Sequence, residues 1–524
     1  MSLVSLTVKQ PEWQRVTEEV FIGKDVLELL STSMYIDPLS LYREYVQNSA
    51  DSLDVVSANN SVPFDSPDVE IFIERQERLI RIVDRGPGLN ASNFVQRITS
   101  IGGSLKRGTK ARGFRGVGRL SGLAFCQELV FRTRENNSNV VHELRWDTRK
   151  IRSMLRAAGD HMDLATIVSE SVEFRSSRAA DEPAHFFEVQ LKNVVRHRDD
   201  RLLDSTVVSN YLGQVAPVPF RSDFSFGPAI SSFLASSGAH HAPLRIFVHG
   251  EGQVYRPHRD TLTLGNGKVL KSLNLQTFTV QDRDGEVAAA TWILHHEYLG
   301  AVPKASNVSG WRLRSGNIQI GGENLLEDLF PETRFNSWTV AETHVLDTKI
   351  VPNGRRDDYE HNAYYGDLLT RLRPFAKEIA NLCRTSSVAR NAHQRVGSEL
   401  DRLEENLSIA SKPRTPPFVV AAFRSELETA LPALHKSAEK SLFDTEEGEV
   451  LRGRLRRIQN KSEQLPSGGA KTDALSDFTP RDRALLLQVI EAIHVIEDTT
   501  SAADKLVGKI LTRLRKQRPR KPQN

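Results

Sequence analysis

The chain has 524 residues, of which 39% are hydrophobic and 26% are charged. At roughly 150 residues per domain this length predicts about three domains, and the composition is that of a globular protein rather than a disordered chain. The two cysteines, Cys126 and Cys383, are too few for a disulfide framework or a four-cysteine zinc site and favour a reducing compartment such as the cytoplasm. The N-terminus lacks a signal-peptide pattern and no apolar run approaches the roughly 20 residues of a membrane span, so we expect no membrane association.

The net charge of +4 is unevenly distributed along the chain. The last twenty residues hold eight lysines and arginines and no acidic residue, so the remainder of the chain is net acidic. Such a tail is either a solvated terminus or a contact for an anionic partner such as nucleic acid, and the sequence leaves both readings open.

Alternating and helical patterns of apolar residues predict the elements of the first 220 residues. A helix is expected over 23–59, with an interruption at Asp37-Pro38, and a hairpin over 69–84 that delivers Asp84 into a glycine turn. The further expected elements are strands at 128–134, 140–146 and 185–192 and a helix over about 198–215.

The pattern changes twice in the rest of the chain. Residues 221–243 are rich in Ser, Gly and Pro and predict a linker or long loop. Strands are expected within LRIFVHG, QTFTVQD and ATWILHHEYL, and a short helix at NLLEDLF. From about residue 366 onward we expect helices, broken at 411–418 and at QLPSGGAKTD, with an apolar seam whose members are Leu368, Leu372, Phe375, Ile379, Leu382, Val396, Leu400, Leu403 and Leu407.

Three motifs in the first 120 residues carry the chemistry. Glu44, Asn48 and Asp51 are spaced by four and three residues, which places them on one face of a helix. Asp84-x-Gly86-x-Gly88 follows a strand, where glycines allow close approach of a ligand and the carboxylate can accept a hydrogen bond. A third motif, Gly113-x-x-Gly116-x-Gly118, precedes an expected helix and offers backbone N–H groups to phosphates.

Together these motifs resemble those of the GHKL ATPases, a superfamily that includes gyrase-type topoisomerases, the heat-shock protein 90 chaperones, MutL and MORC proteins and sensor histidine kinases. The resemblance is greatest to the heat-shock protein 90 family, in the segments REYVQNSADSLD, DRGPGLNASNFVQRITSIGGS and GFRGVGRLSGLAF. It implies a GHKL (Bergerat) α/β sandwich over 1–220 and a transducer-like α/β middle domain over 221–365. It does not extend to 366–524, where the residue pattern predicts a helical C-terminal region, so we expect an α+β fold with three parts.

The resemblance also implies a role for each motif residue. Glu44 would deprotonate the water that attacks the γ-phosphate of ATP, Asn48 would be a ligand of Mg²⁺, and Asp84 would accept the adenine amino group. The remaining nucleotide-binding residues implied are Asp51, Gly86, Gly88, Leu89 as an apolar wall, Lys106 in the lid (with Arg107, Lys110 and Arg112 as rivals), and Gly113, Gly116, Val117 and Gly118 around the phosphates.

Two features lie further along the chain. The family usually places a threonine on a later strand beside the adenine-binding aspartate, and the matching strand here, AHFFEVQL, carries His185 near that position instead. In the middle domain the family supplies a basic residue to the γ-phosphate; the similar segment here is LDTKIVPNGRRDDYEHN, with Arg356 the best match and Arg355 its neighbour. The alternative for these arginines is a surface cluster paired with Asp357 and Asp358.

The resemblance implies a cytoplasmic, Mg²⁺-dependent ATPase that acts as a dimeric clamp on a protein partner or client. One alternative is a MORC- or MutL-like ATPase associated with DNA through the basic tail, and another is a nucleotide-dependent scaffold in a multi-protein system such as a defence system. The chain lacks the acidic linker and the C-terminal Met-Glu-Glu-Val-Asp of the eukaryotic chaperones, which weighs against client folding. The apolar seam after residue 366 suggests a homodimer, unless these helices cover one another within one chain.

Overall fold

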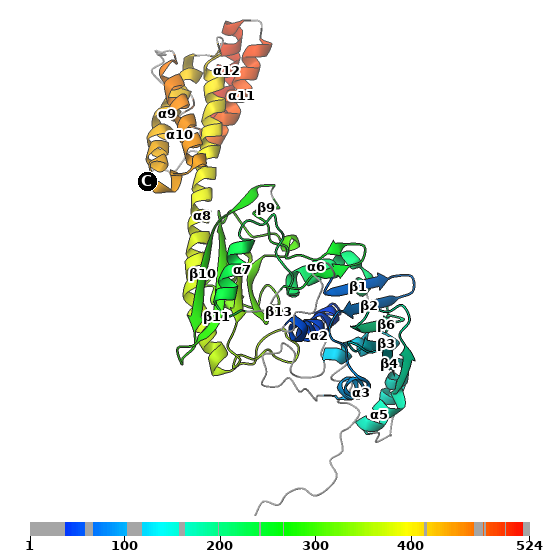
Figure 1. Ribbon diagram of the computed structural model, residues 1–524. Coiled ribbons are helices and arrows are strands. Elements are labelled where there is room, and N and C mark those ends of the chain that lie inside the picture. Colours follow the sequence, from blue (N-terminus) through cyan, green and yellow to red (C-terminus); the bar gives the residue numbers. More distant parts are fainter. Residues whose placement is uncertain are drawn as a thin grey trace, which may run out of the picture. The chain divides into compact units, whose positions relative to one another are not determined.

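The computed structural model describes residues 37–57, 67–101, 118–156, 163–196, 199–239, 243–265, 267–412, 415, 417–465, 475, 478–497 and 499–516. The chain divides into two compact units, residues 1–381 and 382–524. The first is built on two β-sheets, and the second is helical (Figure 1). The mixed α and β organisation, with a helical C-terminal region, is the one expected from the sequence.

The first sheet has eight strands in the described part of the chain, in the order β5–β4–β3–β6–β2–β1–β7–β8. Neighbouring strands are antiparallel except β1 and β7, which are parallel. The strands are β1 (Val69–Glu74), β2 (Leu79–Asp84), β3 (Glu128–Arg134), β4 (Val140–Asp147), β5 (Val172–Arg178), β6 (Phe186–Lys192), β7 (Ile246–Val248) and β8 (Gly252–Gln253).

Helices contribute to a common apolar core with this sheet. They are α2 (Ser40–Ser57), α3 (Ala91–Thr99), α4 (Thr148–Arg156), α5 (Leu164–Ser171) and α6 (Ser205–Val215), with the 3₁₀ helices η2 (Gly118–Ala124) and η3 (Arg201–Leu203). Helix α2 begins two residues after Pro38, and the Asp37 carboxylate accepts a hydrogen bond from the backbone N–H of Leu39 at 3.1 Å. The interruption predicted at Asp37-Pro38 is therefore the start of the described helix, while residues 23–36 lie outside the described ranges.

Most of the predicted strands are confirmed. The hairpin pairs β1 with β2 from Val69↔Asp84 to Glu74↔Leu79, so the second strand ends at Asp84 as expected. The predicted helix over 198–215 begins later than expected, because Asp204 caps α6 by accepting a hydrogen bond from the Val207 N–H. Strand β5 and helices α4 and α5 are absent from the sequence-based expectation.

The second sheet has the order β13–β12–β14–β11–β10–β9 within the described residues. Its strands are β9 (Thr261–Thr263), β10 (Val269–Gln281), β11 (Val287–His296), β12 (Gly310–Ser315), β13 (Ile318–Ile320) and β14 (Val340–Val345). The short 3₁₀ helices η4 (Lys304–Ser306), η5 (Glu327–Leu329) and η6 (Thr333–Trp338) lie in its connections, and η5 is the short helix expected at NLLEDLF.

The prediction of a linker or long loop over 221–243 is wrong in its central part. Helix α7 (Gly227–Ser236) occupies it, with Ile230 and Leu234 buried against Trp292 and Leu294 of β11. The spacing of Ile230 and Leu234 by four residues creates an apolar stripe within a Ser- and Gly-rich segment. After α7 the chain returns to the first sheet as β7 and β8, so that sheet extends past residue 220. The domain boundaries at 220 and 365 stay predictions.

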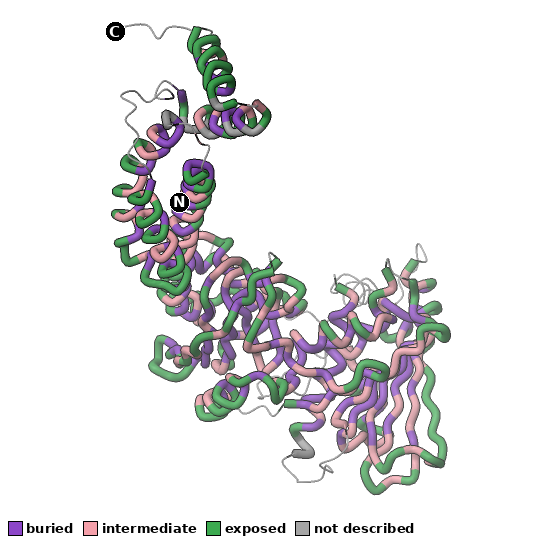
Figure 2. The backbone as a smooth tube through the Cα atoms, turned by 90° about the horizontal axis from the view of Figure 1, so that it is seen from above, coloured by how far each residue is buried: buried purple, intermediate pink, exposed green. Residues whose placement is uncertain are grey.

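The C-terminal helices are α8 (Ala363–Ala410), α9 (Pro417–Ala438), α10 (Glu446–Glu463), α11 (Pro480–Ile496) and α12 (Thr500–Lys516), with the 3₁₀ helix η7 (Ser441–Phe443). The first part of α8 belongs to the first unit, where Phe375 stacks on Phe278 of β10 with ring centroids 3.8 Å apart. The rest of α8 and the other helices form the second unit, in which buried and exposed positions alternate along each helix (Figure 2).

The apolar seam predicted from residue 366 onward is mostly covered within one chain. Leu368, Leu372 and Ile379 are buried in the first unit, and the members Val396, Leu400, Leu403 and Leu407 belong to the core of the second. Only Leu382 of the seam is exposed, at 40%. The idea that this seam is shared between two chains is therefore wrong, and the homodimer remains a prediction without that support.

Candidate functional site

Helix α2 carries all three residues of the first motif and packs on η2. Glu44 and Asp51 are buried and Asn48 is half-buried, whereas Tyr42, Tyr45 and Val46 lie in the core. Tyr45 ties α2 to η2, because its hydroxyl donates to the Arg119 carbonyl at 3.2 Å and accepts from the Gly122 N–H at 3.0 Å. The carboxylate of Glu44 is thus fixed beside the start of η2.

Gly118 at the start of η2 touches the carboxylate of Glu44. A Cβ atom at Gly118 would lie 2.3 Å from Glu44 Oε2, so no other residue fits here without displacing that side chain. Gly118 is the one glycine of the third motif that the structure describes. The other predicted residues of the lid and phosphate loop, Lys106, Gly113, Gly116 and Val117, lie outside the described residues with the rivals Arg107, Lys110 and Arg112.

Asp84 ends β2 beneath α2 and is buried. Its carboxylate accepts hydrogen bonds from the Ser49 hydroxyl and from the Gly86 N–H, both at 2.9 Å. Burial raises the pKa of Asp84 to about 6, although these hydrogen bonds and the nearby His185 act in the opposite direction. A buried acceptor with this geometry can receive an amino group of a bound base.

The glycine turn after Asp84 packs so closely on neighbouring protein atoms that side chains at its glycines would clash. A Cβ at Gly86 would meet Ser52 Oγ at 2.2 Å and Asp84 Oδ1 at 2.7 Å. Gly88 has a positive φ of 70°, and a Cβ there would lie 1.9 Å from the Arg134 carbonyl oxygen. Leu89 is half-buried and packs against the core cluster of the sheet. The structure thus brings Asp84, Gly86, Gly88 and Leu89 together at the end of β2.

Neighbouring strands complete this turn. His185 lies just before β6, and its Nδ1 is 2.7 Å from the Gly86 carbonyl oxygen. His185 is therefore beside the Asp84 turn, as expected of the residue that stands near the position of the family's threonine. A threonine does support the turn, but from β3: the hydroxyl of Thr133 accepts from the Leu89 N–H at 3.0 Å and donates to the Phe186 carbonyl at 3.1 Å. Sequence reasoning missed Thr133, and also Ser49, whose place beside the Glu44–Asn48 face of α2 could have suggested it.

The second sheet brings Arg356 to the same carboxylate as Gly118. Arg356 Nε lies 3.4 Å from Glu44 Oε1, and both side chains are buried. Arg356 has a left-handed backbone with φ 57°, and its carbonyl accepts from the Gly321 N–H at 2.9 Å. Arg355 is exposed. Asp357 accepts from Asn353 and Asp358 from Tyr365, so these two acids have partners of their own.

Arg43 links α2 to this loop directly. Its Nη2 donates to the Arg355 carbonyl at 2.9 Å, its Nη1 to the Arg356 carbonyl at 3.4 Å, and it lies 3.5 Å from Glu44 Oε1. The Glu44 carboxylate therefore lies between two guanidinium groups, one from each side of the contact. The motif spacing gave no indication of Arg43.

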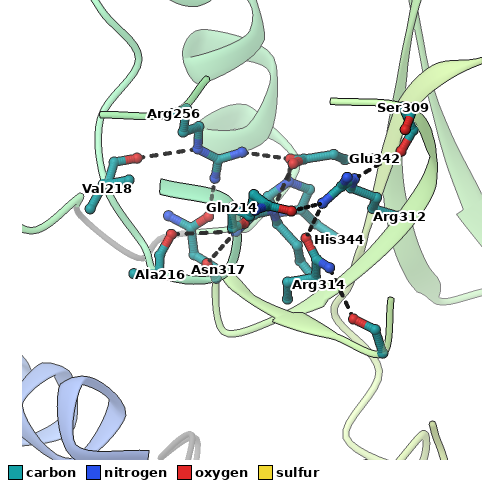
Figure 3. A network of polar contacts seen from close by, with 12 residues as sticks. Gln214, Ala216, Val218, Arg256, Ser309, Arg312, Arg314, Asn317, Glu342 and His344 are labelled. Atoms are coloured by element: carbon teal, nitrogen blue, oxygen red, sulfur yellow. Dashed lines mark hydrogen bonds and ion pairs between the residues drawn. The ribbon is translucent and has the colours of Figure 1, made fainter. Parts of the chain in front are cut away.

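A buried polar network connects the second sheet to the end of α6 (Figure 3). Glu342 of β14 forms ion pairs with Arg256 at 2.6 Å and with Arg314 of β12 at 2.8 Å. Burial by itself raises the pKa of Glu342, but the two arginines outweigh it and hold that pKa well below its usual range. The same arginines donate to the carbonyls of Gln214, Ala216 and Val218, which fixes the chain after α6 against the second sheet.

The side chains of this site fit the binding of Mg²⁺ and a nucleotide. Asn48 lies one turn after Glu44, and its side chain hydrogen-bonds none of the described residues, so its amide oxygen is available to a hard cation. Among the described residues no group of three or more His, Cys, Asp or Glu could hold a metal ion. A Mg²⁺ ion here would thus take Asn48 together with phosphate oxygens and water, an arrangement that this ion prefers.

Residues 43–177 match the family model described as histidine kinase-, DNA gyrase B- and HSP90-like ATPase. Residues 43–177 thus form a GHKL-type ATPase domain. The match begins at the helix turn that carries Glu44 and ends in β5, and it supports ATP binding by this domain. No curated protein gave a match to the chain. None of the described helices has both the length and the apolar character needed to cross a bilayer.

Proposed function

We propose that the chain is an HSP90-like ATPase that hydrolyses ATP with Mg²⁺ and uses the reaction to drive a clamp-like change acting on a protein partner. The observation that carries this proposal is the contact of Arg356 with Glu44, at 3.4 Å, between the second-sheet region and the GHKL-type domain. A contact of this kind lets the second sheet respond to what occupies the nucleotide site.

Each side chain of the site has a specific task in this reaction. Glu44 accepts the proton of the attacking water. Asn48 would hold a Mg²⁺ ion together with the phosphates, and the ion would supply charge neutralisation there. Asp84 accepts the amino group of the base, with Ser49 and His185 holding the turn around it. Arg356 is the side chain placed to leave Glu44 for the γ-phosphate, since its permanently charged fork matches phosphate oxygens.

The test is a comparison of binding and turnover in Glu44→Ala. The variant should bind ATP with nearly wild-type affinity and hydrolyse it roughly 10²–10⁴-fold more slowly, because a general base contributes about that much to the rate. Binding is measured by calorimetry and turnover by phosphate release. Unchanged turnover would remove Glu44 from the mechanism.

A second pair of variants tests the role of the second sheet. Arg356→Ala should lower turnover with little change in ATP affinity, and arginines that act on phosphoryl transfer contribute up to about 10³–10⁵-fold. Arg355→Ala is the matched control, because Arg355 is exposed and only its backbone carbonyl contacts Arg43. Loss of turnover in Arg355→Ala alone would assign the role to the neighbouring residue.

A MORC- or MutL-like activity on DNA is the second candidate. The observation that favours it is the basic end of α12, whose last turn holds Arg513, Arg515 and Lys516. In that case DNA binding should weaken steeply with salt and on replacement of Arg513, Arg515 and Lys516 by glutamine, because release of counterions drives such binding. Salt-independent association with a protein partner would favour the chaperone-like activity instead.

A further inference from the structure

An open pocket of ≈ 580 Å³ lies against α4, on a part of the GHKL-type domain that the nucleotide site does not use. Its lining residues are Gln127, Arg149, Arg152, Ser153 and Arg156. The four residues from α4 follow the spacing of one helical face, while Ile151 and Met154 on the other face are buried in the core. Three guanidinium groups, a hydroxyl and an amide therefore meet in one pocket whose lining includes no acid.

Arg152 is held in place by backbone carbonyls at the end of the 3₁₀ helix η2 and just after it. Its Nη2 donates to the carbonyl oxygens of Leu123 at 3.0 Å, Ala124 at 2.9 Å and Cys126 at 3.2 Å. Burial, and after it the neighbouring charge of Arg156, lower the pKa of Arg152. The guanidinium group is thus preorganised next to a second positive charge, an arrangement that an anion would stabilise.

The other two arginines of the pocket are only weakly paired with carboxylates. Arg149 lies 3.6 Å from a Glu128 carboxylate oxygen and 3.8 Å from one of Asp147, both longer than a charge-assisted hydrogen bond. Arg156 forms no ion pair within the described part of the chain. An anion in the pocket would therefore meet Arg156, which has no ion pair among the described residues, and Arg149, whose two ion pairs are long.

The basic residues around the pocket, in contrast, are paired. Arg145 bonds Glu173 on β5, and Lys150 lies 3.4 Å from Glu170 on α5. An extended polyanion would need a continuous track of available cations, and these carboxylates interrupt it. The charge distribution favours a compact anion over a nucleic-acid strand.

We propose that this pocket binds a small ligand that carries one or more phosphate groups. The planar fork of arginine matches phosphate oxygens, and the volume lies in the range of small-ligand sites. The site is separate from the nucleotide site, because Arg152 contacts the carbonyl end of η2 whereas Gly118, at the opposite end, contacts Glu44.

The experiment is calorimetry with inorganic pyrophosphate on the full chain, in saturating ADP so that the nucleotide site is filled. Arg156→Gln removes one pocket charge from an exposed position, and Lys150→Gln removes one charge from the same helix outside the pocket lining. Pyrophosphate should bind the wild type and Lys150→Gln alike, and Arg156→Gln roughly tenfold or more weakly, as expected for loss of a hydrogen bond between charged groups.

Two results would overturn the proposal: equal weakening in both variants, which would indicate general surface charge, or no pyrophosphate binding in the presence of ADP. Displacement of pyrophosphate by a single-stranded oligonucleotide that binds more tightly would overturn the assignment to a small ligand. Circular dichroism of both variants shows whether they are folded. The comparison does not depend on ATP hydrolysis, because it measures the binding of pyrophosphate in the presence of ADP.

Discussion

The fold and a bound nucleotide favour opposite charge states of the Asp84 carboxyl group. Its burial favours the neutral carboxyl and raises its pKa to about 6, whereas acceptance of a base amino group favours the carboxylate. Ser49 and the Gly86 N–H each donate to this carboxylate and so partly offset the cost of its charge. The residue therefore titrates close to neutral pH, where its charge state can be followed.

We predict that ADP affinity falls as the pH is lowered through about 6, because protonation removes an acceptor from the base site. The contribution of Asp84 to the stability of the ligand-free protein has the opposite sign. A folded-state pKa above the unfolded value stabilises the fold at acid pH, and this contribution is lost as the pH rises through about 6. Calorimetry with ADP and thermal unfolding without it, between pH 5 and 8, measure the two effects.

The control is Asp84→Asn, which cannot titrate. It should bind ADP roughly 5- to 150-fold more weakly than the wild type does at pH 7–8, because a mismatched buried amide costs about 1–3 kcal/mol. Its thermal unfolding should also lose the part of the pH dependence that Asp84 causes. Wild-type ADP affinity in this variant would show that the base does not bind at Asp84.

Gly118 provides a steric test of the position of Glu44. Gly118→Ala places a methyl group 2.3 Å from Glu44 Oε2, so the carboxylate must move and turnover should fall while ADP still binds. The matched control is Gly453→Ala in α10, where nothing lies within 4 Å and the change should stabilise the helix by about 0.5–1 kcal/mol. Steady-state turnover and urea unfolding distinguish the two, and normal turnover in Gly118→Ala would contradict the contact.

At the scale of the elements, the network around Glu342 connects two layers of structure. It joins β12 and β14 of the second sheet to the chain after α6, and α6 in turn packs on α2, the helix that carries Glu44. The second sheet is therefore attached to α6 by this network and to α2 by the loop of Arg356. An attachment of this kind can transmit a change at the nucleotide site to the second sheet.

Glu342→Gln should destabilise the first unit by about 3–5 kcal/mol, because it leaves buried arginines without their counter-charge. Glutamine is nearly the same size as glutamate, so the loss of stability results from the missing charge rather than from a cavity. Urea unfolding of the full chain measures it. Glu332→Gln is the control, since its partner Arg334 is exposed and such pairs contribute only about 0–1 kcal/mol. Equal stability of the two variants would show that the network does not depend on the Glu342 charge.

At the scale of the whole molecule, the two compact units have separate apolar cores. Helix α8 begins in the first unit, where Leu368, Leu372 and Ile379 are buried, and continues into the second. A truncation at residue 365 would strip that cover from the first unit. The end of the first unit, at Asn381, is the better place to divide the chain.

A chain ending at Asn381 should bind ADP as the full chain does, because the described nucleotide-site residues all belong to the first unit. If the second unit holds two copies together, hydrolysis by this truncated chain should be slower and depend on concentration, since the effective concentration of a tethered partner is roughly millimolar. Light scattering of the full chain with and without ATP provides the companion measurement. A monomer with full activity under both conditions would rule out the clamp.

Several parts of the fold could be predicted from the sequence because their causes are local. Val69, Ile71 and Ile73 recur at every second position, a local pattern that favours a strand. Pro38 has a fixed φ and no backbone N–H, which favours a helix start close after it. The spacing of Glu44, Asn48 and Asp51 determines that they share a helical face. Helix α7 was missed because its Ser-rich composition indicates a loop, and only its contacts with Trp292 and Leu294 make it a buried helix.

The sequence was enough to propose the chemistry of the site, because its three motifs contain the carboxylate, the amide and the glycine turns that the proposal uses. It also singled out Arg356 through a resemblance, with Arg355 as an alternative. Only the tertiary structure placed Arg356 rather than Arg355 beside Glu44, placed Thr133 and Ser49 around the Asp84 turn, returned β7 to the first sheet and covered the apolar seam of α8. The physical reason is that these contacts join residues far apart in the chain, whose approach depends on how whole sheets and helices pack rather than on any local pattern.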